Sequence, residues 1–168
     1  MKVAYKGVMA SVDLDDRGVV VGCLACGKNN RLSYERLGDA VRCGQCKQPL
    51  TAPGVPIEVH QTALFDRLVA NSSLPVVVDY WAPWCGPCRM VAPELQKVAA
   101  RQAGRMIVVK VNTDELSDLG QRFKIQSIPT LAVFANGREV ARSSGARPAS
   151  EIEAWVEQAT KTPQHQGH

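Results

Sequence analysis

The sequence lacks a long apolar run, an internal repeat and a recognisable leader segment. Its longest apolar stretch, LPVVVDYWAPW, is interrupted by an aspartate and two prolines, and it is far shorter than the roughly 20 apolar residues of a membrane-spanning helix. The first 22 residues contain DLDD and no apolar segment, so they do not resemble a secretory signal. We therefore expect a cytoplasmic protein in a reducing compartment, where structural disulfides are rare.

The chain changes character at residues 48–56, QPLTAPGVP, where prolines and a glycine interrupt it. Before this stretch lie four cysteines and few large apolar side chains, and after it lie alternating strand-like and helix-like runs. We predict an N-terminal extension with a cysteine-rich module over residues 1–50, a linker over 51–56, an α/β domain over 57–160 and a disordered tail over 161–168.

The second part of the chain has a regular order of elements. The runs VPIEV, LPVVVDYWA and MIVVKVN are typical of buried strands, while ALFDRLVAN, residues 86–103 and ELSDLGQRF have helical spacing. TLAVFANGREVARSSG predicts a hairpin around Asn136-Gly137, and SEIEAWVEQA predicts a last helix with a capping box formed by Ser150 and Glu153. This order implies a mixed central sheet flanked by helices.

All six cysteines lie in Cys-x-x-Cys units, and one of these, WCGPC, follows the most apolar strand. Cys85 is then expected at a helix N-terminus, where free backbone N–H groups and the helix dipole stabilise a thiolate. Cys88 lies one turn further on the same face, shielded where Cys85 is accessible. Cys85 can attack a substrate disulfide, and Cys88 can then release the reduced substrate by attacking Cys85.

A shielded thiol at Cys88 needs a proton acceptor, and Asp79 within VVVDYW is the candidate. A carboxylate buried among valine, tyrosine and tryptophan should have a raised pKa and can accept or return a proton. Lys110, on the next predicted strand, is a candidate charge partner for Asp79.

The segment VVVDYWAPWCGPCRMVAP, followed by SIPT at residues 127–130, resembles the thioredoxin family over about residues 55–160. The resemblance implies a thioredoxin fold, with Cys85 as nucleophile, Cys88 as resolving thiol and Asp79 as proton carrier. It also implies a cis peptide bond before Pro129. The substrate-binding surface that it implies is formed by Trp84, Gly86, Pro87, Ile128, Pro129 and Gly145.

The other four cysteines, Cys23, Cys26, Cys43 and Cys46, form two Cys-x-x-Cys pairs with the spacing of a zinc ribbon. Four thiolates favour tetrahedral Zn²⁺, and the glycines after Cys26 and Cys43 suit the tight turns of such knuckles. The alternatives to a zinc site are two disulfides, an iron site, or dithiols that relay electrons to Cys85 and Cys88. Spacing alone does not distinguish iron from zinc.

A four-cysteine module ahead of WCGPC resembles the zinc-carrying bacterial thioredoxins of the thioredoxin 2 type, although about twenty extra residues precede Cys23. The resemblance implies a monomeric protein-disulfide reductase with one structural Zn²⁺ and no organic cofactor. It also implies thioredoxin reductase as the electron donor. Ribonucleotide reductase, methionine sulfoxide reductase and peroxidases are the substrates it implies.

Three other functions compete with this interpretation. A thiol oxidase or isomerase uses the same chemistry at a potential about 90 mV higher. A nucleic-acid-binding ribbon is disfavoured, because residues 1–50 carry eight Lys/Arg against five Asp/Glu and a tetrathiolate zinc site removes about two positive charges. A redox switch, in which oxidation of the ribbon ejects the metal, is compatible with the sequence as an added property.

Overall fold

The computed structural model describes residues 12–50 and 52–161, which form two β-sheets and their helices. The larger sheet has the strand order β4-β6-β5-β7-β8. Its first three members run parallel to one another, β7 pairs antiparallel with β5, and β8 pairs antiparallel with β7 in a hairpin. These strands are β4 (Ile57–Val59), β5 (Val76–Trp81), β6 (Ile107–Asn112), β7 (Thr130–Ala135) and β8 (Arg138–Ser144).

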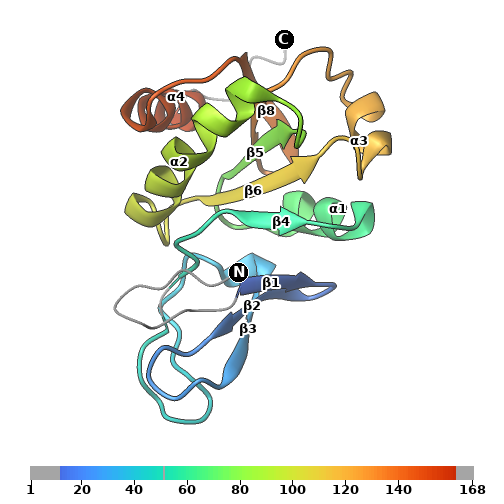
Figure 1. Cartoon of the computed structure of the whole chain (residues 1–168). Helices are drawn as coiled ribbons and strands as arrows, with labels where there is room; N and C mark the ends of the chain where they lie inside the picture. The colour runs from blue at the N-terminus through green and yellow to red at the C-terminus, as the bar shows by residue number, and fades with distance from the viewer. Residues whose placement is uncertain (1–11, 51, 162–168) are drawn as a thin grey trace.

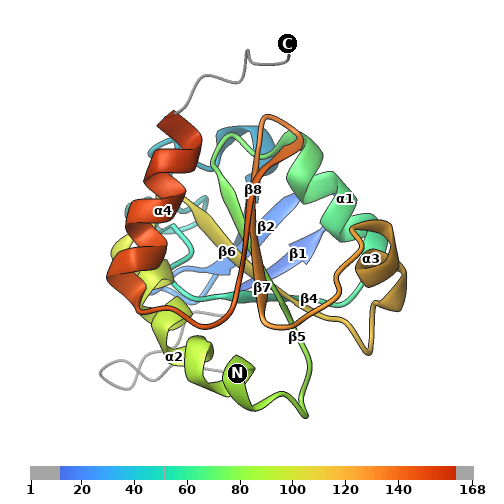
Figure 2. The same cartoon turned by 90° about the horizontal axis from the view of Figure 1, so that it is seen from above.

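Four α-helices cover the two faces of this sheet, α1 and α3 on one side and α2 and α4 on the other (Figure 2). The thioredoxin fold implied by the sequence is therefore confirmed. In the part of the chain that the structure describes, no helix is both long and apolar enough to cross a membrane. The helices are α1 (Thr62–Asn71), α2 (Gly86–Arg101), α3 (Ser117–Arg122) and α4 (Ala149–Lys161).

The side chains of β5 alternate between the two faces, and this alternation decides where Asp79 points. Val76, Val78 and Tyr80 belong to the core on the α1 and α3 side, whereas Val77 belongs to the core under α2 and α4. Because side chains two residues apart share a face, Asp79 lies on the side of Val77, toward α2. The strand thus places a carboxyl group under the helix that carries the two cysteines.

The predicted hairpin at Asn136-Gly137 is confirmed, since both residues have positive φ angles between β7 and β8. The predicted capping box of the last helix is wrong. Ser150 lies inside α4, which begins at Ala149, and Glu153 accepts hydrogen bonds from the side chains of Arg101 and Gln102 of the α2 region. Tertiary partners therefore outweigh the local pattern at this helix end.

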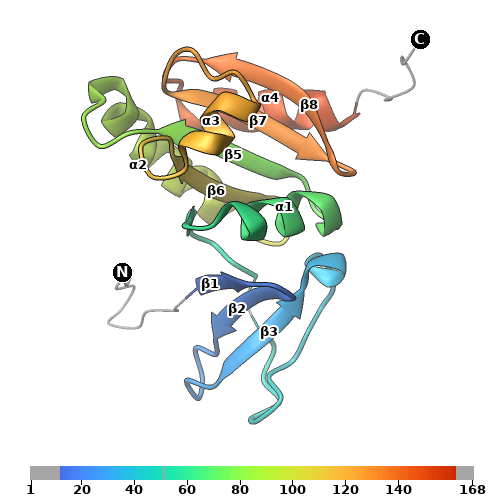
Figure 3. The same ribbon diagram turned by 90° about the vertical axis from the view of Figure 1, so that its right-hand side faces the viewer.

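The N-terminal module contains an antiparallel sheet that the sequence analysis did not predict. Its elements are β1 (Val12–Asp15), β2 (Gly18–Gly22), β3 (Asn29–Ser33) and the 3-10 turn η1 (Tyr34–Arg36). Figures 1 and 3 show this small sheet beside β4 and α1 of the larger domain.

The two sheets share one hydrophobic core. Leu14, Val19 and Tyr34 of the N-terminal module belong to the same buried cluster as Ile57 and Phe65 of the larger domain. Polar contacts reinforce this junction. The backbone N–H of Ser73 donates to the carbonyl oxygen of Tyr34 over 3.0 Å, and Arg67 Nη1 lies 3.5 Å from the carbonyl oxygen of Asp16.

Because the core is continuous, a cavity at the junction should weaken both parts together. We expect Tyr34→Ala to lower the free energy of unfolding by about 3–5 kcal/mol, the usual cost of deleting a buried aromatic side chain. Glu35→Ala, an exposed neighbour in the same turn, is the matched control and should change stability little. Chemical denaturation followed by tryptophan fluorescence, which reports on the larger domain, measures the difference. An unchanged midpoint in the Tyr34→Ala variant would contradict the shared core.

Candidate functional site

Cys85 and Cys88 are joined by a disulfide at the start of α2, with their Cα atoms 5.3 Å apart. Cys85 is the N-cap residue of the helix, and the backbone N–H of Cys88 points at its sulfur over 3.2 Å. This N–H and the helix dipole favour negative charge on Cys85 Sγ, which is the condition for a reactive thiolate.

The expected difference in accessibility between the two cysteines is not visible in the disulfide-bonded state, since each is only 4% exposed. The bond between the sulfurs and the nearby loop before β7 cover Cys85 as well. Gly86 and Pro87, between the cysteines, are exposed, as is the Trp84 side chain, at 65%. Trp84 is held by a hydrogen bond from Nε1 to Asp114 Oδ2 over 3.0 Å, a partner that the sequence analysis missed.

A second loop, which precedes β7, meets the disulfide at the same end of the sheet, because Thr130 at the start of β7 pairs with Tyr80 near the end of β5. The peptide bond between Ile128 and Pro129 is cis, as the resemblance implies, and the carbonyl oxygen of Ile128 lies 3.7 Å from Cys85 Sγ. The backbone N–H of Gly145 donates to the carbonyl oxygen of Pro129 over 2.9 Å. Gly145 has a φ of 94°, a conformation that favours glycine. The structure therefore brings Ile128, Pro129 and Gly145 to one side of the disulfide.

Asp79 is fully buried on the α2 side of β5, and neither of its carboxylate oxygens has a hydrogen-bond partner among the described residues. Burial raises the pKa of Asp79 to about 7, while the positive charge of Lys110 opposes the rise and the negative charge of Glu58 adds to it. A carboxyl group with this pKa is partly protonated near neutral pH, so it can both accept and return a proton.

Lys110 lies beside Asp79 in the strand register, but it forms its ion pair with another residue. Its Nζ atom is 3.9 Å from Glu58 Oε2 on β4 and 4.6 Å from the centre of the Trp81 ring. Glu58 was not predicted from the sequence. The alternation Ile-Glu-Val in β4 indicates that Glu58 lies on the face opposite its buried neighbours. Its contact with Lys110 could not be predicted without knowing the register in which β4 pairs with β6.

The other four cysteines gather at one end of the N-terminal module. The sulfur atoms of Cys23, Cys26, Cys43 and Cys46 all lie within 4.8 Å of one another, and none of these residues forms a disulfide. Two sulfur pairs, Cys23 with Cys46 and Cys26 with Cys43, are 3.7 Å apart. Zn–S bonds of about 2.3 Å in a tetrahedral site place sulfurs about 3.8 Å apart, so the cluster has the dimensions of a tetrathiolate metal site.

Each cysteine pair closes a tight turn whose left-handed residue directly follows the second cysteine. In the first turn this residue is Gly27, with a φ of 82°, and in the second it is Lys47, with a φ of 67°. The expected role of the glycine after Cys43 is therefore wrong, because Gly44 lies within the turn but is not its left-handed residue. Instead, the backbone N–H of Gly44 donates to the side chain of Asn30 over 3.0 Å.

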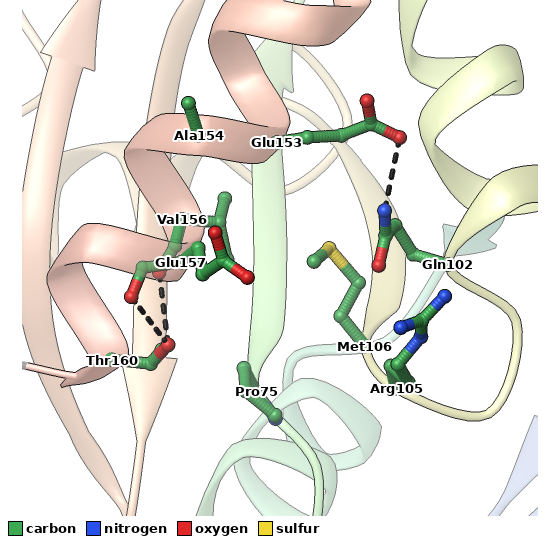
Figure 4. Close-up of a pocket in the computed structure, with 9 residues that line it drawn as sticks. All are labelled: Pro75, Gln102, Arg105, Met106, Glu153, Ala154, Val156, Glu157 and Thr160. Atoms are coloured by element: carbon green, nitrogen blue, oxygen red, sulfur yellow. Dashed lines mark hydrogen bonds between the residues drawn. The ribbon is translucent and has the colours of Figure 1, made fainter.

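A cavity of about 330 Å³ lies between α2 and α4 (Figure 4). It is next to Pro75 and Met106, which precede β5 and β6, so it lies at the opposite end of these strands from Cys85. None of the predicted site residues lines it. Its lining consists of Pro75, Gln102, Arg105, Met106, Glu153, Ala154, Val156, Glu157 and Thr160.

Comparisons with known proteins agree with this geometry. Residues 56–158 match the family described as Thioredoxin. Thioredoxin C-3 of Corynebacterium nephridii is 39% identical over 146 residues, which cover 87% of this chain and 99% of that protein. Thioredoxin of Haemophilus influenzae is 42% identical over 94 residues, covering 56% and 88%.

Solved structures give the same result for the fold. A mutant thioredoxin from Halobacterium salinarum NRC-1 superposes with a TM-score of 0.60 at 28% identity, covering 67% of this chain and 96% of that one. Chloroplastic thioredoxin z superposes with a TM-score of 0.58 at 32% identity, covering 64% and 96%.

Proposed function

Since the chain belongs to the thioredoxin family and is a thiol-disulfide oxidoreductase, we propose that it reduces protein disulfides through Cys85 and Cys88. The observation that carries the proposal is the Cys85–Cys88 pair at the N-terminus of α2, on the face of the sheet toward which buried Asp79 points. The test is reduction of a protein disulfide, such as those of insulin, with electrons supplied by NADPH and a thioredoxin reductase. No reduction above the protein-free rate would overturn the proposal.

In the proposed reaction the thiolate of Cys85 attacks one sulfur of a substrate disulfide. A Cys85–substrate disulfide forms, and the other substrate sulfur leaves as a thiolate. Cys88 then gives its proton to the Asp79 carboxylate and attacks Cys85 Sγ. The Cys85–Cys88 disulfide forms, the second substrate sulfur leaves, and it takes up the proton. Two electrons have passed from the dithiol to the substrate.

The exposed groups around the disulfide supply the proposed docking surface. A substrate strand can pair with the backbone of Ile128 beside Pro129, while Trp84 and Gly145 flank it; Gly86 and Pro87 present the disulfide. This surface is small and largely apolar, which suits a protein that acts on many disulfides. Ribonucleotide reductase, methionine sulfoxide reductase and peroxidases remain the expected substrates, and a monomer in the cytoplasm remains the expected state.

We further propose that Cys23, Cys26, Cys43 and Cys46 hold one Zn²⁺ with a structural role. When bound, the ion cross-links the two knuckles of the N-terminal module. The sulfur separations support this assignment, as does the backbone N–H of Gln45, which points at Cys43 Sγ over 3.3 Å and favours its thiolate form. The division of the chain near residues 51–56 remains a prediction.

The role of Asp79 predicts a specific pH dependence. In Asp79→Asn the step that releases the mixed disulfide should slow by about 10- to 100-fold at pH 7–8, because a proton acceptor is lost. The rise of the wild-type rate with a midpoint near pH 7, which reflects ionisation of Asp79, should disappear. Rapid-quench kinetics with a disulfide substrate over pH 5–9 measures both effects. Equal rates in the two proteins at every pH would contradict this role.

The same substitution should raise stability. The folded protein keeps a proton on Asp79 up to a pKa of about 7, whereas the unfolded chain loses it near pH 4. The free energy of unfolding therefore falls as pH rises from about 4 to about 7. Asp79→Asn removes this fall, so the variant should be more stable than the wild type at pH 8. Denaturant titrations at pH 4 and pH 8 test the sign.

A further inference from the structure

Three charged side chains form a row across the α2 side of the larger sheet. Strand pairing places Glu58 of β4 opposite Lys110 of β6, and Lys110 opposite Asp79 of β5. Because residues paired across neighbouring strands share a face, the three side chains point the same way. The row runs from the edge strand β4 to β5, the strand that precedes Cys85 and Cys88 in the chain.

Exposure increases along this row toward the edge of the sheet. Asp79 is fully buried, while the side chains of Lys110 and Glu58 are 19% and 40% exposed. The Lys110 ammonium group lies 3.9 Å from Glu58 Oε2 and against the Trp81 ring. Asp79, in contrast, has no hydrogen-bond partner among the described residues. The cation is therefore held by the outer carboxylate and the indole ring, without a hydrogen bond to the inner carboxyl group.

We propose that Glu58 is a positioning residue for proton transfer at Asp79: it holds the Lys110 ammonium toward the sheet edge and so keeps Asp79 able to carry a proton. This inference rests on the proposed function, in which Asp79 exchanges a proton with Cys88. It assigns a role in the reaction to a residue of an edge strand that contacts neither cysteine.

The position of the Lys110 ammonium matters because of its electrostatic effect on Asp79. A cation close to a buried carboxyl group stabilises the ionised form strongly, because the interior screens charge poorly. Burial would still raise the pKa of Asp79 if Lys110 acted on it without Glu58, but a larger fraction of Asp79 would be ionised near neutral pH and it would return a proton less readily. Glu58 offsets the field of Lys110 with its own negative charge, which agrees with the opposite directions in which the two residues move the pKa of Asp79.

Among the residues that the structure describes, few other charged groups act on this row. Asp79 is influenced by Lys110 and Glu58, and α2 supplies the thiol of Cys88. Burial raises the pKa of Glu58, while Lys110 and His60 lower it and Glu115 raises it. His60 Nδ1 lies 3.0 Å from Glu115 Oε2, and the two residues move the pKa of Glu58 in opposite directions.

The test is Glu58→Gln, which keeps the size of the side chain and removes its charge. The midpoint of Asp79 titration, followed by carboxyl ¹³C NMR of the reduced protein, should fall by about half a unit or more. The midpoint of the pH dependence of mixed-disulfide release should fall with it, so that release at pH 6 becomes about threefold faster. Glu115→Gln, a neighbouring carboxylate that does not pair with Lys110, is the matched control and should leave both midpoints near the wild-type values.

Two further variants test whether Glu58 acts through Lys110 and Asp79. Lys110→Met should move the Asp79 midpoint upward, opposite to Glu58→Gln. The Glu58→Gln/Asp79→Asn double variant should behave like Asp79→Asn, which shows that Glu58 acts through Asp79. An unchanged or raised Asp79 midpoint in Glu58→Gln overturns the inference about Glu58 and leaves the role of Asp79 intact. If Asp79→Asn shows wild-type kinetics, the proposed role of Asp79 is wrong. In that case the NMR titration of Glu58→Gln still measures the effect of Glu58 on the ionisation of Asp79.

Discussion

Replacing Cys85 with serine is expected to lower the rate of protein-disulfide reduction by about 10³-fold or more. The attacking thiolate is lost, and a serine hydroxyl at the same helix N-terminus is not ionised near neutral pH. We do not expect Cys88 to take over, because the N-cap position and the backbone N–H that stabilise a thiolate belong to residue 85, while Cys88 lies inside the first turn of α2. Reduction of insulin disulfides with NADPH and a thioredoxin reductase measures the loss.

The Cys88→Ser variant separates the two steps. Cys85 should still attack the substrate, but the mixed disulfide should accumulate, because the resolving thiol is absent. Mass spectrometry should find the substrate attached at Cys85, and the Cys85→Ser/Cys88→Ser double variant is the control that should form no such adduct. An adduct on Cys23, Cys26, Cys43 or Cys46, together with activity in Cys85→Ser, would show instead that the N-terminal cysteines carry out the exchange.

Loss of the metal should have the second large effect, on stability. Cys43→Ser removes one of the four predicted ligands at a fully buried position. Structural zinc sites contribute many kcal/mol to the folding of small modules, and the N-terminal module shares its core with the larger domain. We expect the melting temperature of the whole chain to fall by about 10 °C or more, on the scale of 2–4 °C per kcal/mol for a protein of this size.

Calorimetry and metal analysis together test this expectation. Purified wild type should contain one zinc per chain, and Cys43→Ser should contain none. Gln45→Ala, in the same knuckle, is the matched control, because Gln45 is exposed and only its backbone N–H contacts Cys43. An unchanged melting transition after complete loss of the metal would show that the module does not stabilise the larger domain.

The parts of the site that were predictable from sequence depend on short-range order. A helix that follows a buried strand places Cys85 at a helix N-terminus, and three residues are one turn, so the Cys85–Cys88 pair follows from local geometry. The four-cysteine cluster was also predictable from local geometry, since each Cys-x-x-Cys unit is a single turn. The burial of Asp79 also follows locally, from an apolar strand on both sides of it.

The parts that were missed depend on register and on tertiary competition. Glu58 and Lys110 are far apart in the chain, and they meet only because β4 pairs with β6. Glu153 fits a capping box in sequence, but Arg101 and Gln102 take its carboxylate. The antiparallel sheet of the N-terminal module went unpredicted because its strands are short and depend on the larger domain to cover Leu14, Val19 and Tyr34.

The most direct test of the central proposal is the equilibrium reduction potential of Cys85/Cys88 in the metal-loaded protein, measured by dithiothreitol or glutathione titration with thiol trapping. A reductase should give a value close to the one known for the thioredoxin family, about −270 mV. A value near −180 mV, as in protein disulfide isomerase, corresponds to a dithiol that donates electrons less readily by about 4 kcal/mol. That result would contradict the reductase and assign this protein to disulfide formation or isomerisation.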